Sequence, residues 1–555
     1  MTTFDEQPLL PTDSLERRRH QIYPVLGEAD MRHVRAFAVE RNFPDGAKVF
    51  VAGRRREGML FVVEGAIDVY RHDGFDNDAL IITLRPGQYS SDSGQLSDLR
   101  PAMTDGIAVG ALKVLLLSSE ALRALVVAHA DLGERLIRSL ILRTVMLLER
   151  NSGGPVIIGP RGHGRVHALQ SFLNANSHPC TVLDPADDPR AAELMAQHQP
   201  TPDELPLVVC PDVGVKKNPT VVELGRCIGM LRELSEDKVW DVIVVGGGPA
   251  GLATAVYAGS EGLSVLLLET RAYGGQAGAS ARIENYLGFP TGISGAALTG
   301  RAYVQAEKFG VEIVIPAPAG RLVCDTYPLQ VEMCGSLTML KARSVVLSCG
   351  ARYRRPSLAN LKQFEGRGVY YWASSVEAQL CKMEEVVLVG GGNSAGQAAV
   401  FLAGHALKVH IVIRKGSLSS TMSSYLIERI QAHPNIELHT YTEIVGLEGD
   451  EDGLKRVSFL NSQTGVEETC DTRRLFLFIG ADPNTGWLEG CGVEVCKHGF
   501  IRTGMDASSS ASLQTSVPGV FAIGDVRANS TKRVAAAVGE GAAVVAQIHQ
   551  FLASR

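Results

Sequence analysis

Four short runs of predominantly apolar residues stand out in the C-terminal half of the chain. They are Val242–Val245, Val265–Leu268, Glu385–Val389 and Val409–Ile413. Continuous apolar runs of this length are typical of parallel strands that are buried on both faces. Because a glycine-rich loop and a helical stretch follow the first and third runs, we predict two β-α-β units.

The first glycine-rich loop has the spacing of a dinucleotide-binding fingerprint. It reads Gly246-Gly247-Gly248-Pro249-Ala250-Gly251. The first glycine of such a loop permits a tight turn, the second lets the backbone approach a pyrophosphate, and the third permits close packing of helix on strand. The helix predicted from Ala250 to Gly259 points its positive end at the phosphates. Glu269 ends the second strand, 23 residues after Gly246, where an acid can hydrogen-bond a ribose.

The second glycine-rich loop begins 144 residues after the first. It reads Gly390-Gly391-Gly392-Asn393-Ser394-Ala395, and a helix is predicted to follow it as far as Gly404. The next strand ends in Arg414 and Lys415 rather than in an acid. Basic residues at this position accommodate the 2′-phosphate of NADPH, whereas an acid would bind the 2′-hydroxyl of NADH. We therefore predict NADPH; the alternative for the two basic residues is a solvated strand end.

A strand and a helix near the C-terminus complete the first nucleotide site. The strand predicted from Pro518 ends in Gly524-Asp525, and an aspartate there can bind the ribityl hydroxyls of a flavin. A helix opens directly afterwards, and its N-terminus can stabilise negative charge on a reduced flavin. Its first residues, which we predict to contact the cofactor, are Arg533, Val534 and Ala535.

Residues 238–555 resemble the low-molecular-weight thioredoxin reductases. Two further segments carry this likeness, Tyr273-Gly274-Gly275-Gln276 and Ile283-Glu284-Asn285-Tyr286. They resemble the segments of that family that contact the isoalloxazine ring, which implies flavin contacts for Gly275, Gln276 and Asn285. The resemblance also implies a homodimer that uses FAD and NADPH, with an FAD-binding domain at 238–356 and 483–555. The NADPH-binding domain would be residues 357–482.

The chain lacks the redox-active Cys-x-x-Cys that this family carries just before the second fingerprint. The sequence at that place is Trp372-Ala373-Ser374-Ser375. A serine hydroxyl cannot alternate between thiolate and disulfide at neutral pH. We expect Cys381 and Cys349 to serve in packing. Trp372 either stacks on the flavin or blocks access to it, or it fills the space of the missing disulfide.

The remaining chemistry is hydride transfer from nicotinamide to flavin, which demands no acid–base residue. We therefore predict no catalytic side chain and no thioredoxin reduction. Electrons would leave the flavin directly for a small molecule or a redox protein. The alternative is a weakly catalytic sensor, in which flavin and nucleotide occupancy act through the N-terminal part of the chain.

Residues 30–150 predict an antiparallel β-roll followed by a helical stretch from Ser119 to about Arg150. The predicted strands are Lys48–Val51, Leu60–Val63, Ala66–Tyr70, Leu80–Leu84 and Val114–Leu117, with turns at Gly53 and Gly65. This unit resembles the cyclic-nucleotide-binding domains, which hold the cyclic phosphate with a Gly-Glu pair and an arginine. Here Ser91, Asp92 and Arg100 stand at those positions. We expect a packing or regulatory role, with cyclic-nucleotide binding as the alternative.

Residues 151–235 alternate strands and helices in an order that resembles the thioredoxin and glutaredoxin folds. Leu205-Pro206 stands where that family places a cis-proline. The segment after the first strand, Gly159–Gly164, contains no cysteine. We therefore expect a structural or docking unit, with a redox module as the minority alternative.

Length and composition support this α/β assignment of two Rossmann-like domains preceded by a β-roll and a thioredoxin-like domain. The 555 residues exceed one core, and residues 1–29 form an N-terminal extension. The net charge of −6 gives no reason to expect nucleic acid or an anionic membrane as a partner. No signal peptide is expected. None of the ten cysteines has metal-site or redox-motif spacing, so we predict no metal, free thiols and a cytoplasmic location.

Overall fold

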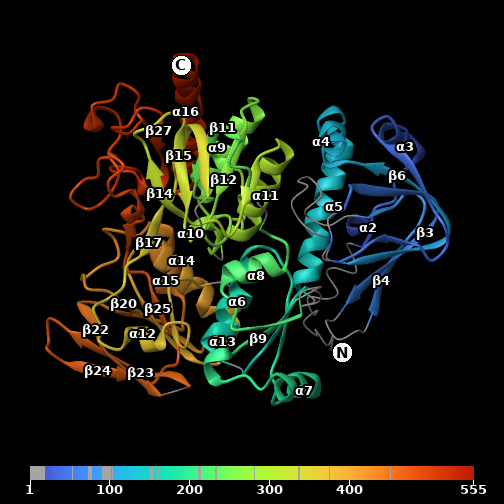
Figure 1. Cartoon of the computed structure of the whole chain (residues 1–555). Helices are drawn as coiled ribbons and strands as arrows, with labels where there is room; N and C mark the ends of the chain where they lie inside the picture. The colour runs from blue at the N-terminus through green and yellow to red at the C-terminus, as the bar shows by residue number, and fades with distance from the viewer. Residues whose placement is uncertain are drawn as a thin grey trace, which may run out of the picture. The chain divides into compact units, whose positions relative to one another are not determined.

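The computed structural model divides the chain into two compact units (Figure 1). The first unit comprises Met1–Pro160 and Asn176–Arg232, and the second comprises Arg161–Ala175 and Glu233–Arg555. The structure describes residues 19–52, 54, 56–72, 78–90, 102, 104–149, 154–160, 162–210, 214–231, 234–280, 282–335, 338–373, 375–450 and 452–555. None of the helices in these ranges combines the length and the apolar character that crossing a membrane requires.

The first unit begins with the antiparallel sheet that the strand pattern predicted. Its order is β1-β6-β3-β4, with β2 paired to β6 and β5 to β3. The strands are β1 (Val39–Phe43), β2 (Lys48–Phe50), β3 (Met59–His72), β4 (Asp78–Leu84), β5 (Tyr89–Ser90) and β6 (Asp105–Leu117). The turn predicted at Gly65 is wrong. Gly65 lies inside β3 with a φ of +78°, where the register to β6 shifts, so it forms a bulge in one long strand.

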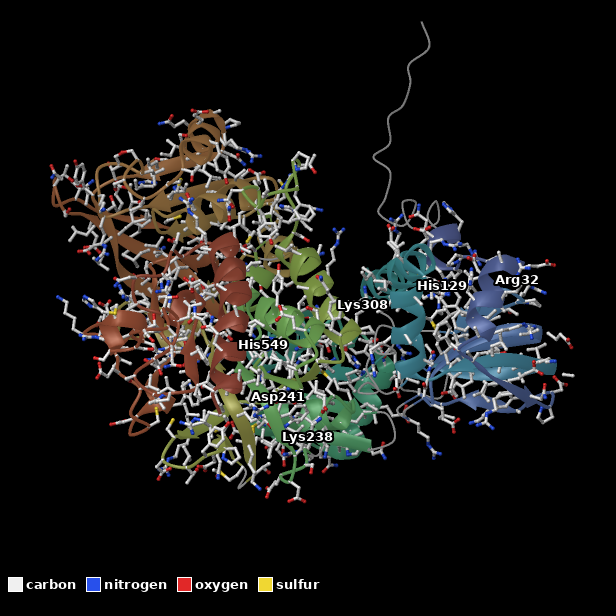
Figure 2. The ribbon with its side chains drawn as sticks, turned by 90° about the horizontal axis from the view of Figure 1, so that it is seen from above. Arg32, His129, Lys238, Asp241, Lys308 and His549 are labelled. Atoms are coloured by element: carbon white, nitrogen blue, oxygen red, sulfur yellow. A yellow bond between two sulfur atoms is a disulfide. The ribbon has the colours of Figure 1, made fainter. Side chains whose placement is uncertain are left out.

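Four helices accompany this sheet. They are α2 (Arg19–Ile22), α3 (Glu28–Arg35), α4 (Ser119–Ala128) and α5 (Ala130–Glu149), so the single helix predicted from Ser119 is interrupted at His129, which Figure 2 labels. The buried guanidinium of Arg143 on α5 donates to the carbonyl oxygens of Ile22 (2.8 Å) and Tyr89 (3.0 Å). These bonds tie α5 to α2 and to β5.

A separate four-stranded sheet follows, in the order β10-β9-β7-β8. Its strands are β7 (Val156–Ile158), β8 (Thr181–Leu183), β9 (Leu207–Cys210) and β10 (Gly214–Lys217), and its helices are α7 (Pro189–His198) and α8 (Val221–Cys227). The sequence analysis missed β10. The cis bond predicted at Leu205-Pro206 is confirmed. The prediction that all cysteines are free is wrong, because Cys210 and Cys227 form a disulfide. Sequence spacing did not reveal this pair because Cys210 ends β9 and Cys227 ends α8, 17 residues later.

The second unit contains the first predicted dinucleotide fold. Its sheet has the order β13-β12-β11-β16-β15-β14, with β27 on β16. The strands are β11 (Val239–Val245), β12 (Val265–Leu268), β13 (Glu312–Val314), β14 (Ala319–Val323), β15 (Leu329–Met333), β16 (Met339–Leu347) and β27 (Val520–Ala522). The helices are α9 (Pro249–Ser260), α11 (Gly295–Lys308) and α16 (Val534–Ala553). The parallel pairing of β11 with β12 and β16 explains why these strands are continuously apolar.

A polar network joins the central strands of this sheet. Asp241 of β11, labelled in Figure 2, accepts hydrogen bonds from the backbone N–H and the hydroxyl of Ser264. Arg343 of β16 donates to the same carboxylate at 2.9 Å. Burial opposes ionisation, but these hydrogen bonds hold the pKa of Asp241 below its ordinary value. The network therefore links β11 and β16 to the residue before β12, near the partly exposed start of β11.

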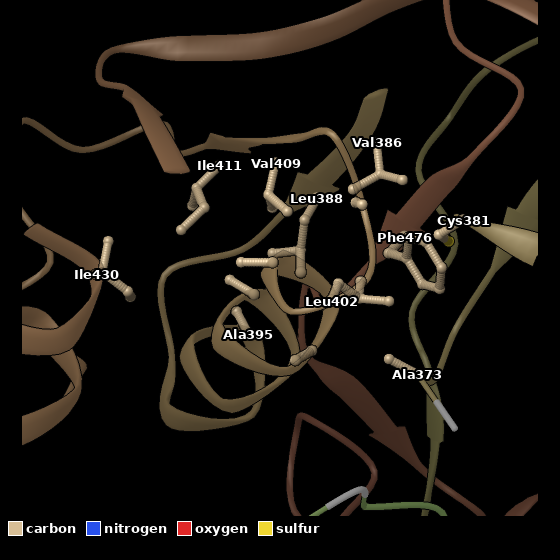
Figure 3. Close-up of a cluster of buried hydrophobic side chains, with 14 of the residues drawn as sticks. Ala373, Cys381, Val386, Leu388, Ala395, Leu402, Val409, Ile411, Ile430 and Phe476 are labelled. Carbon is tan, nitrogen blue, oxygen red and sulfur yellow. The ribbon is translucent and has the colours of Figure 1, made fainter. Parts of the chain in front are cut away.

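The second dinucleotide fold lies in the same unit. Its parallel sheet has the order β18-β25-β19-β20-β21. The strands are β18 (Val369–Tyr370), β19 (Glu385–Val389), β20 (Lys408–Val412), β21 (Ile436–His439) and β25 (Leu475–Leu477). Helix α14 (Asn393–Ala403) covers one face through the apolar cluster drawn in Figure 3, in which Cys381 packs beside Phe476. The other face packs on the three-stranded sheet of β22 (Thr442–Asp450), β23 (Gly453–Asn461) and β24 (Glu467–Cys470).

Short elements complete the second unit. They are α6 (Gly164–Ala175), α10 (Gly275–Gly278), β17 (Ala351–Tyr353), α12 (Leu361–Phe364), α13 (Ser375–Leu380), α15 (Ser424–Ala432) and β26 (Ala481–Pro483). Strands β17 and β26 pair antiparallel where the chain leaves and re-enters the first dinucleotide fold. The two crossings lie side by side, which is how one dinucleotide fold is inserted into the other.

Candidate functional site

One cavity of about 370 Å³ receives residues from both dinucleotide folds of the second unit. The predicted residues that line it are Gly246, Gly248, Pro249, Ala250, Glu269, Gly275, Gln276, Asn285, Asn393, Ser394, Gly524, Asp525, Arg533 and Val534. Five predicted residues are not part of this lining: Gly251, Gly390, Gly392, Ala395 and Ala535. Arg414 and Lys415 also lie outside it.

The three glycines of the first fingerprint have different surroundings. Gly246 adopts a φ of +108°, and a Cβ there would lie 2.3 Å from the carbonyl oxygen of Ser348. A Cβ on Gly251 would lie 1.9 Å from the carbonyl oxygen of Gly246, so α9 packs on the loop only because this residue has no side chain. At Gly248 a Cβ would meet nothing within 4 Å. The loop is therefore tightly packed at Gly246 and Gly251 and open at Gly248.

The N-terminus of α9 has the features of an anion-binding site. Its N-cap residue, Gly248, makes no side-chain capping bond, so the first N–H groups of the helix are left for a ligand. Nearby, the Glu269 carboxylate accepts from the backbone N–H groups of Gly247 (2.7 Å) and Arg271 (2.9 Å). Burial raises the pKa of Glu269 above its usual value, against the lowering effect of these bonds. The two bonds fix the carboxylate at the cavity wall, where it can accept from a hydroxyl.

Asp525 follows β27 at the opposite wall. Burial raises the pKa of its carboxyl group, and the neighbouring Lys532 partly offsets this effect. The Lys532 ammonium donates to the backbone carbonyl of Asp525 at 2.6 Å, and Glu540 accepts from the N–H of Gly524 at 2.6 Å. Helix α16 begins next to this segment, and its N-cap residue Arg533 makes no side-chain capping bond. An acceptor carboxylate and a free helix N-terminus therefore lie together, as binding of polyol hydroxyls and of an anionic ring edge requires.

The segment that resembles the flavin-contacting region closes the cavity beside α9. Gly275 adopts a φ of +52°, and a Cβ there would come within 3.2 Å of the Cα of Gly248. The side-chain amide of Gln276 donates to the carbonyl oxygen of Ala351 on β17. Asn285 also lines the cavity. These residues bring the segment against the first fingerprint.

The second fingerprint reaches the cavity through two of its residues. The Asn393 side chain accepts from the N–H of Ser423 at 2.7 Å, and this bond fixes Asn393 at the N-terminus of α14. Gly390 has a φ of +145°, and a Cβ on it would lie 2.4 Å from the carbonyl oxygen of Phe478. Ala395 is buried in the core of this fold instead. The loop turns tightly at its first glycine, as predicted, and its helix end faces the first nucleotide site.

The basic pair after β20 is exposed to solvent. Arg414 and Lys415 follow the strand directly, and the Lys415 ammonium lies 3.3 Å from the hydroxyl of Ser420. Ile413, the residue before them, would contact a Cβ on Gly391 at 3.5 Å. The two cations therefore directly follow a residue that lies against the second fingerprint loop, and neither lines the shared cavity.

Trp372 lines the cavity and is held from two sides. Its indole N–H donates to Glu377 at 3.0 Å, and that carboxylate is buried. The guanidinium of Arg271 lies over the indole ring at 4.4 Å and also donates to the hydroxyl of Ser171 on α6. The other side of Trp372 packs against the apolar cluster of the second fold. Trp372 thus packs against the second fold and also forms part of the cavity wall, and its stacking on a flavin stays a prediction.

Burial favours the protonated form of two thiols near the site. Cys349 lines the cavity, in addition to the packing that the sequence analysis assigned to it, and its Sγ lies 3.2 Å from the carbonyl oxygen of Asn484. Burial raises the pKa of the Cys349 thiol to about 12. Cys381 is fully buried, as predicted, and burial raises its pKa to about 12 as well. Among the described residues that line the cavity, Cys349 is the one cysteine, so this lining offers no dithiol.

Several lining residues were not predicted from the sequence. They are Ala277, Ala279, Ser280, Ile283, Ser348, Gly350, Ala351, Tyr353, Ala373, Gln397, Ala398, Phe478, Lys532 and Ala537. Lys532 stands next to the predicted helix start and could have been included. Tyr353 ends β17 and Phe478 follows β25, two short strands that were not predicted, so the tertiary structure alone reveals them. The candidate cyclic-phosphate residues Ser91, Asp92 and Arg100 lie outside the described residues.

Comparison with protein families matches the same part of the chain. The profile described as pyridine nucleotide-disulphide oxidoreductase matches residues 240–541. The thioredoxin reductase of Bacillus subtilis (strain 168) is 31% identical over 319 residues, which cover 58% of this chain and 96% of that protein. The NADPH-dependent thioredoxin reductase 3 of Arabidopsis thaliana is 32% identical over 320 residues, which cover 57% of this chain and 58% of that protein.

Solved structures give the same likeness. The thioredoxin reductase of Lactococcus lactis, in the FR conformation, matches with a TM-score of 0.52 at 26% identity. The match covers 57% of this chain and all of that one. The thioredoxin reductase of T. acidophilum also matches with a TM-score of 0.52 at 26% identity, over 57% of this chain and 99% of that one.

Proposed function

The chain belongs to the pyridine nucleotide-disulphide oxidoreductase family, and on that premise we propose that it passes electrons from NADPH through FAD to an acceptor without an internal dithiol. Its relatives include thioredoxin reductases, enzymes that use FAD and NADPH. The proposed acceptor is a small molecule or a redox protein that takes electrons at the flavin itself.

The shared cavity is the observation that carries this proposal. Gly248, Glu269 and Asp525 come from the first fold, and Asn393 and Ser394 come from the second. The open Gly248 and the uncapped start of α9 fit a pyrophosphate, and the Glu269 carboxylate fits a ribose. When both cofactors are bound, they supply hydride transfer from nicotinamide to flavin. The contribution of the protein is to hold both in one space and to exclude water.

Individual side chains would have separate roles in that space. Asp525 would accept from ribityl hydroxyls, and the N-terminus of α16 would stabilise negative charge on the flavin ring. The exposed Arg414 and Lys415 would bind the 2′-phosphate of NADPH, since they stand beside the second fingerprint. Trp372 would form the part of the cavity wall where the relatives carry their redox-active disulfide.

Acceptor assays with the purified full-length protein test the proposal. A yellow protein with flavin absorbance, rapid NADPH oxidation with dyes or quinones, and no turnover of thioredoxin is the expected result. Robust reduction of a thioredoxin disulfide would refute dithiol-free transfer. Slow reduction of every acceptor would instead favour the regulatory alternative.

The double variant Trp372→Cys/Ser375→Cys sharpens this test, because it restores two cysteines at the spacing of the relatives' motif. If the missing thiols alone prevent dithiol exchange, this variant gains a titratable disulfide that NADPH reduces. Trp372→Ser is the matched control, because it removes the same indole without adding a thiol.

We also propose assignments for the N-terminal part. Residues 30–150 would be a cyclic-nucleotide-binding-like β-roll, supported by the antiparallel order of its sheet and the helices after it. Residues 151–235 would be a thioredoxin-like domain, supported by the strand order β10-β9-β7-β8 with β7 and β8 parallel. Calorimetry with cAMP and cGMP tests the first assignment. A homodimer in the cytoplasm follows from family likeness, and light scattering tests the dimer.

A further inference from the structure

A polar cluster interrupts the apolar interior of the second dinucleotide fold, away from the cofactor cavity. His410 of β20 pairs in register with Glu437 of β21, and His439 pairs with Val412. His410 and His439 therefore lie on the sheet face that packs on β22–β24. Glu385 at the start of β19 contacts the ring nitrogen of His410 that points away from His439.

The polar atoms of this cluster have metal-ligand spacing. His410 Nδ1 lies 3.0 Å from His439 Nε2 and 3.8 Å from Glu437 Oε2. His439 Nε2 lies 3.7 Å from Glu437 Oε1. Ligand atoms at the usual Zn–N and Zn–O distances in a tetrahedron are about 3.3–3.6 Å apart. The distances from His439 Nε2 to His410 Nδ1 and to Glu437 Oε1 thus match edges of a tetrahedral site to within a few tenths of an ångström, and the ligand atoms of the three groups all lie within 4.8 Å of one another.

Glu385 selects the ring nitrogen that would bind the metal. His410 Nε2 lies 3.1 Å from Glu385 Oε2, and a carboxylate only accepts, so Nε2 carries the hydrogen. Nδ1 then presents its lone pair to His439 Nε2. Two facing imidazole nitrogens need a proton or a cation between them. A carboxylate behind a ligating histidine is also the usual arrangement around protein-bound zinc.

The surroundings leave one side of the cluster accessible. The side chains of His410 and His439 are only 9% and 15% exposed, whereas that of Glu437 is 47% exposed. The ring of Phe459 covers His439 at 5.3 Å. Lys408 pairs with Glu437 Oε2 at 2.5 Å, so Oε1, the oxygen nearer His439, remains for a metal. An ion could therefore enter from the Glu437 side and retain a water as its fourth ligand.

We propose that His410, Glu437 and His439 bind a divalent ion of the zinc class, with Glu385 as the positioning residue for His410. The ion would clamp β20 to β21 immediately before the Arg414–Lys415 pair. A second set, Glu385, His410 and Cys470, would use the other nitrogen of His410. That nitrogen already donates to Glu385, so this set would break the hydrogen bond that orients His410.

Equilibrium dialysis of the chelator-treated, full-length protein against Zn²⁺ tests the site, with bound metal measured by mass spectrometry. The wild type should retain one ion more than His439→Gln and Glu437→Gln. Glu385→Gln should bind that ion about 10- to 100-fold more weakly. His405→Gln, an exposed histidine on the same fold, should match the wild type. A Co²⁺ difference spectrum of tetrahedral type should appear in the wild type and disappear in His439→Gln.

Two outcomes would overturn the proposal. Equal metal content in the wild type, His439→Gln and Glu437→Gln would mean that a proton alone joins the histidines. Loss of the ion in Cys470→Ser, with retention in His439→Gln, would place the metal at the alternative set. Far-ultraviolet circular dichroism of each variant identifies misfolded protein. Because Glu437→Gln changes an exposed side chain, we expect it to disturb the fold least.

Discussion

The two dinucleotide folds of this chain share one local plan but pack their fingerprints differently. In the first, Gly251 lies against the carbonyl oxygen of Gly246, with no room for a Cβ. In the second, Ala395 occupies the corresponding position and is buried in an apolar cluster with α14 and β19. The residue allowed at the third position of the fingerprint therefore depends on how closely the helix approaches the strand. The second fold accommodates a methyl group there, and the first fold excludes it.

The residues that follow the second strand of each β-α-β unit also differ in charge between the two folds. Glu269 is fixed by two backbone N–H groups at the wall of the cavity, where it can meet a hydroxyl. Arg414 and Lys415 are exposed beside their loop, where they can meet a phosphate. A partly buried acid and an exposed pair of cations suit different ligand groups, a hydroxyl and a phosphate, although both follow the second strand of a β-α-β unit.

The largest expected effect comes from substituting the third residue of each fingerprint, Gly251 in the first fold and Ala395 in the second. Gly251→Ala forces the Gly246 backbone to move and should lower the free energy of unfolding of the first fold by about 3 kcal/mol or more, with loss of bound flavin. Ala395→Gly should cost only about 1 kcal/mol. Thermal unfolding and the flavin-to-protein absorbance ratio measure both.

Gly248→Ala is the control within the same loop, since a Cβ there meets no protein atom. It should leave the unfolding temperature of the apoprotein unchanged and weaken flavin binding alone. Equal losses of stability for Gly248→Ala and Gly251→Ala would contradict the distinction between the two glycines.

The next effect concerns the basic pair. Arg414→Ala/Lys415→Ala should raise the KM for NADPH about 10- to 100-fold, because one or two charge-assisted hydrogen bonds to the 2′-phosphate are lost. The KM for NADH should change less than about twofold. Stopped-flow reduction of the flavin by each nucleotide measures this. A parallel loss with both nucleotides would show that the pair is only a solvated strand end.

A smaller effect is expected from Asp525, the carboxylate that follows β27 in the first fold. Because burial raises the folded-state pKa of Asp525, its ionised form costs stability above the unfolded pKa, and this cost disappears as pH falls through the folded pKa. Asp525→Asn should therefore raise the melting temperature of the apoprotein at pH 7 by about 1–3 °C. The gain should shrink as pH falls toward the ordinary aspartate pKa of about 4, and flavin binding should weaken. A gain that grows on acidification would contradict this sign.

The smallest effect is a difference in thiol reactivity. Cys349, with a pKa raised to about 12, should react with a maleimide at pH 7 at least about 100-fold more slowly than the exposed Cys334. Peptide mass spectrometry after timed labelling measures both rates. Rapid labelling of Cys349 would reveal a thiolate at the cavity and would reopen a one-thiol mechanism.

Sequence reasoning worked best where a function needs a local backbone shape. The strand from Glu385 to Val389 agrees with the structure residue for residue, and the helix after Gly392 ends within one residue of the predicted end. It failed where distant segments decide the outcome. Gly65 looked like a turn because its bulge depends on pairing with β6, and Cys210 looked free because its partner lies on a helix 17 residues away.

The sequence by itself determined two nucleotide-binding loops, the charge that follows each, and the absence of a Cys-x-x-Cys, since each is a property of contiguous residues. Only the tertiary structure decided that Asn393 and Asp525 border the same cavity, that Trp372 walls it, and that His410 meets His439. The physical reason is that strand pairing and helix packing set distances between residues far apart in the chain, and no local pattern of hydrophobicity encodes those distances.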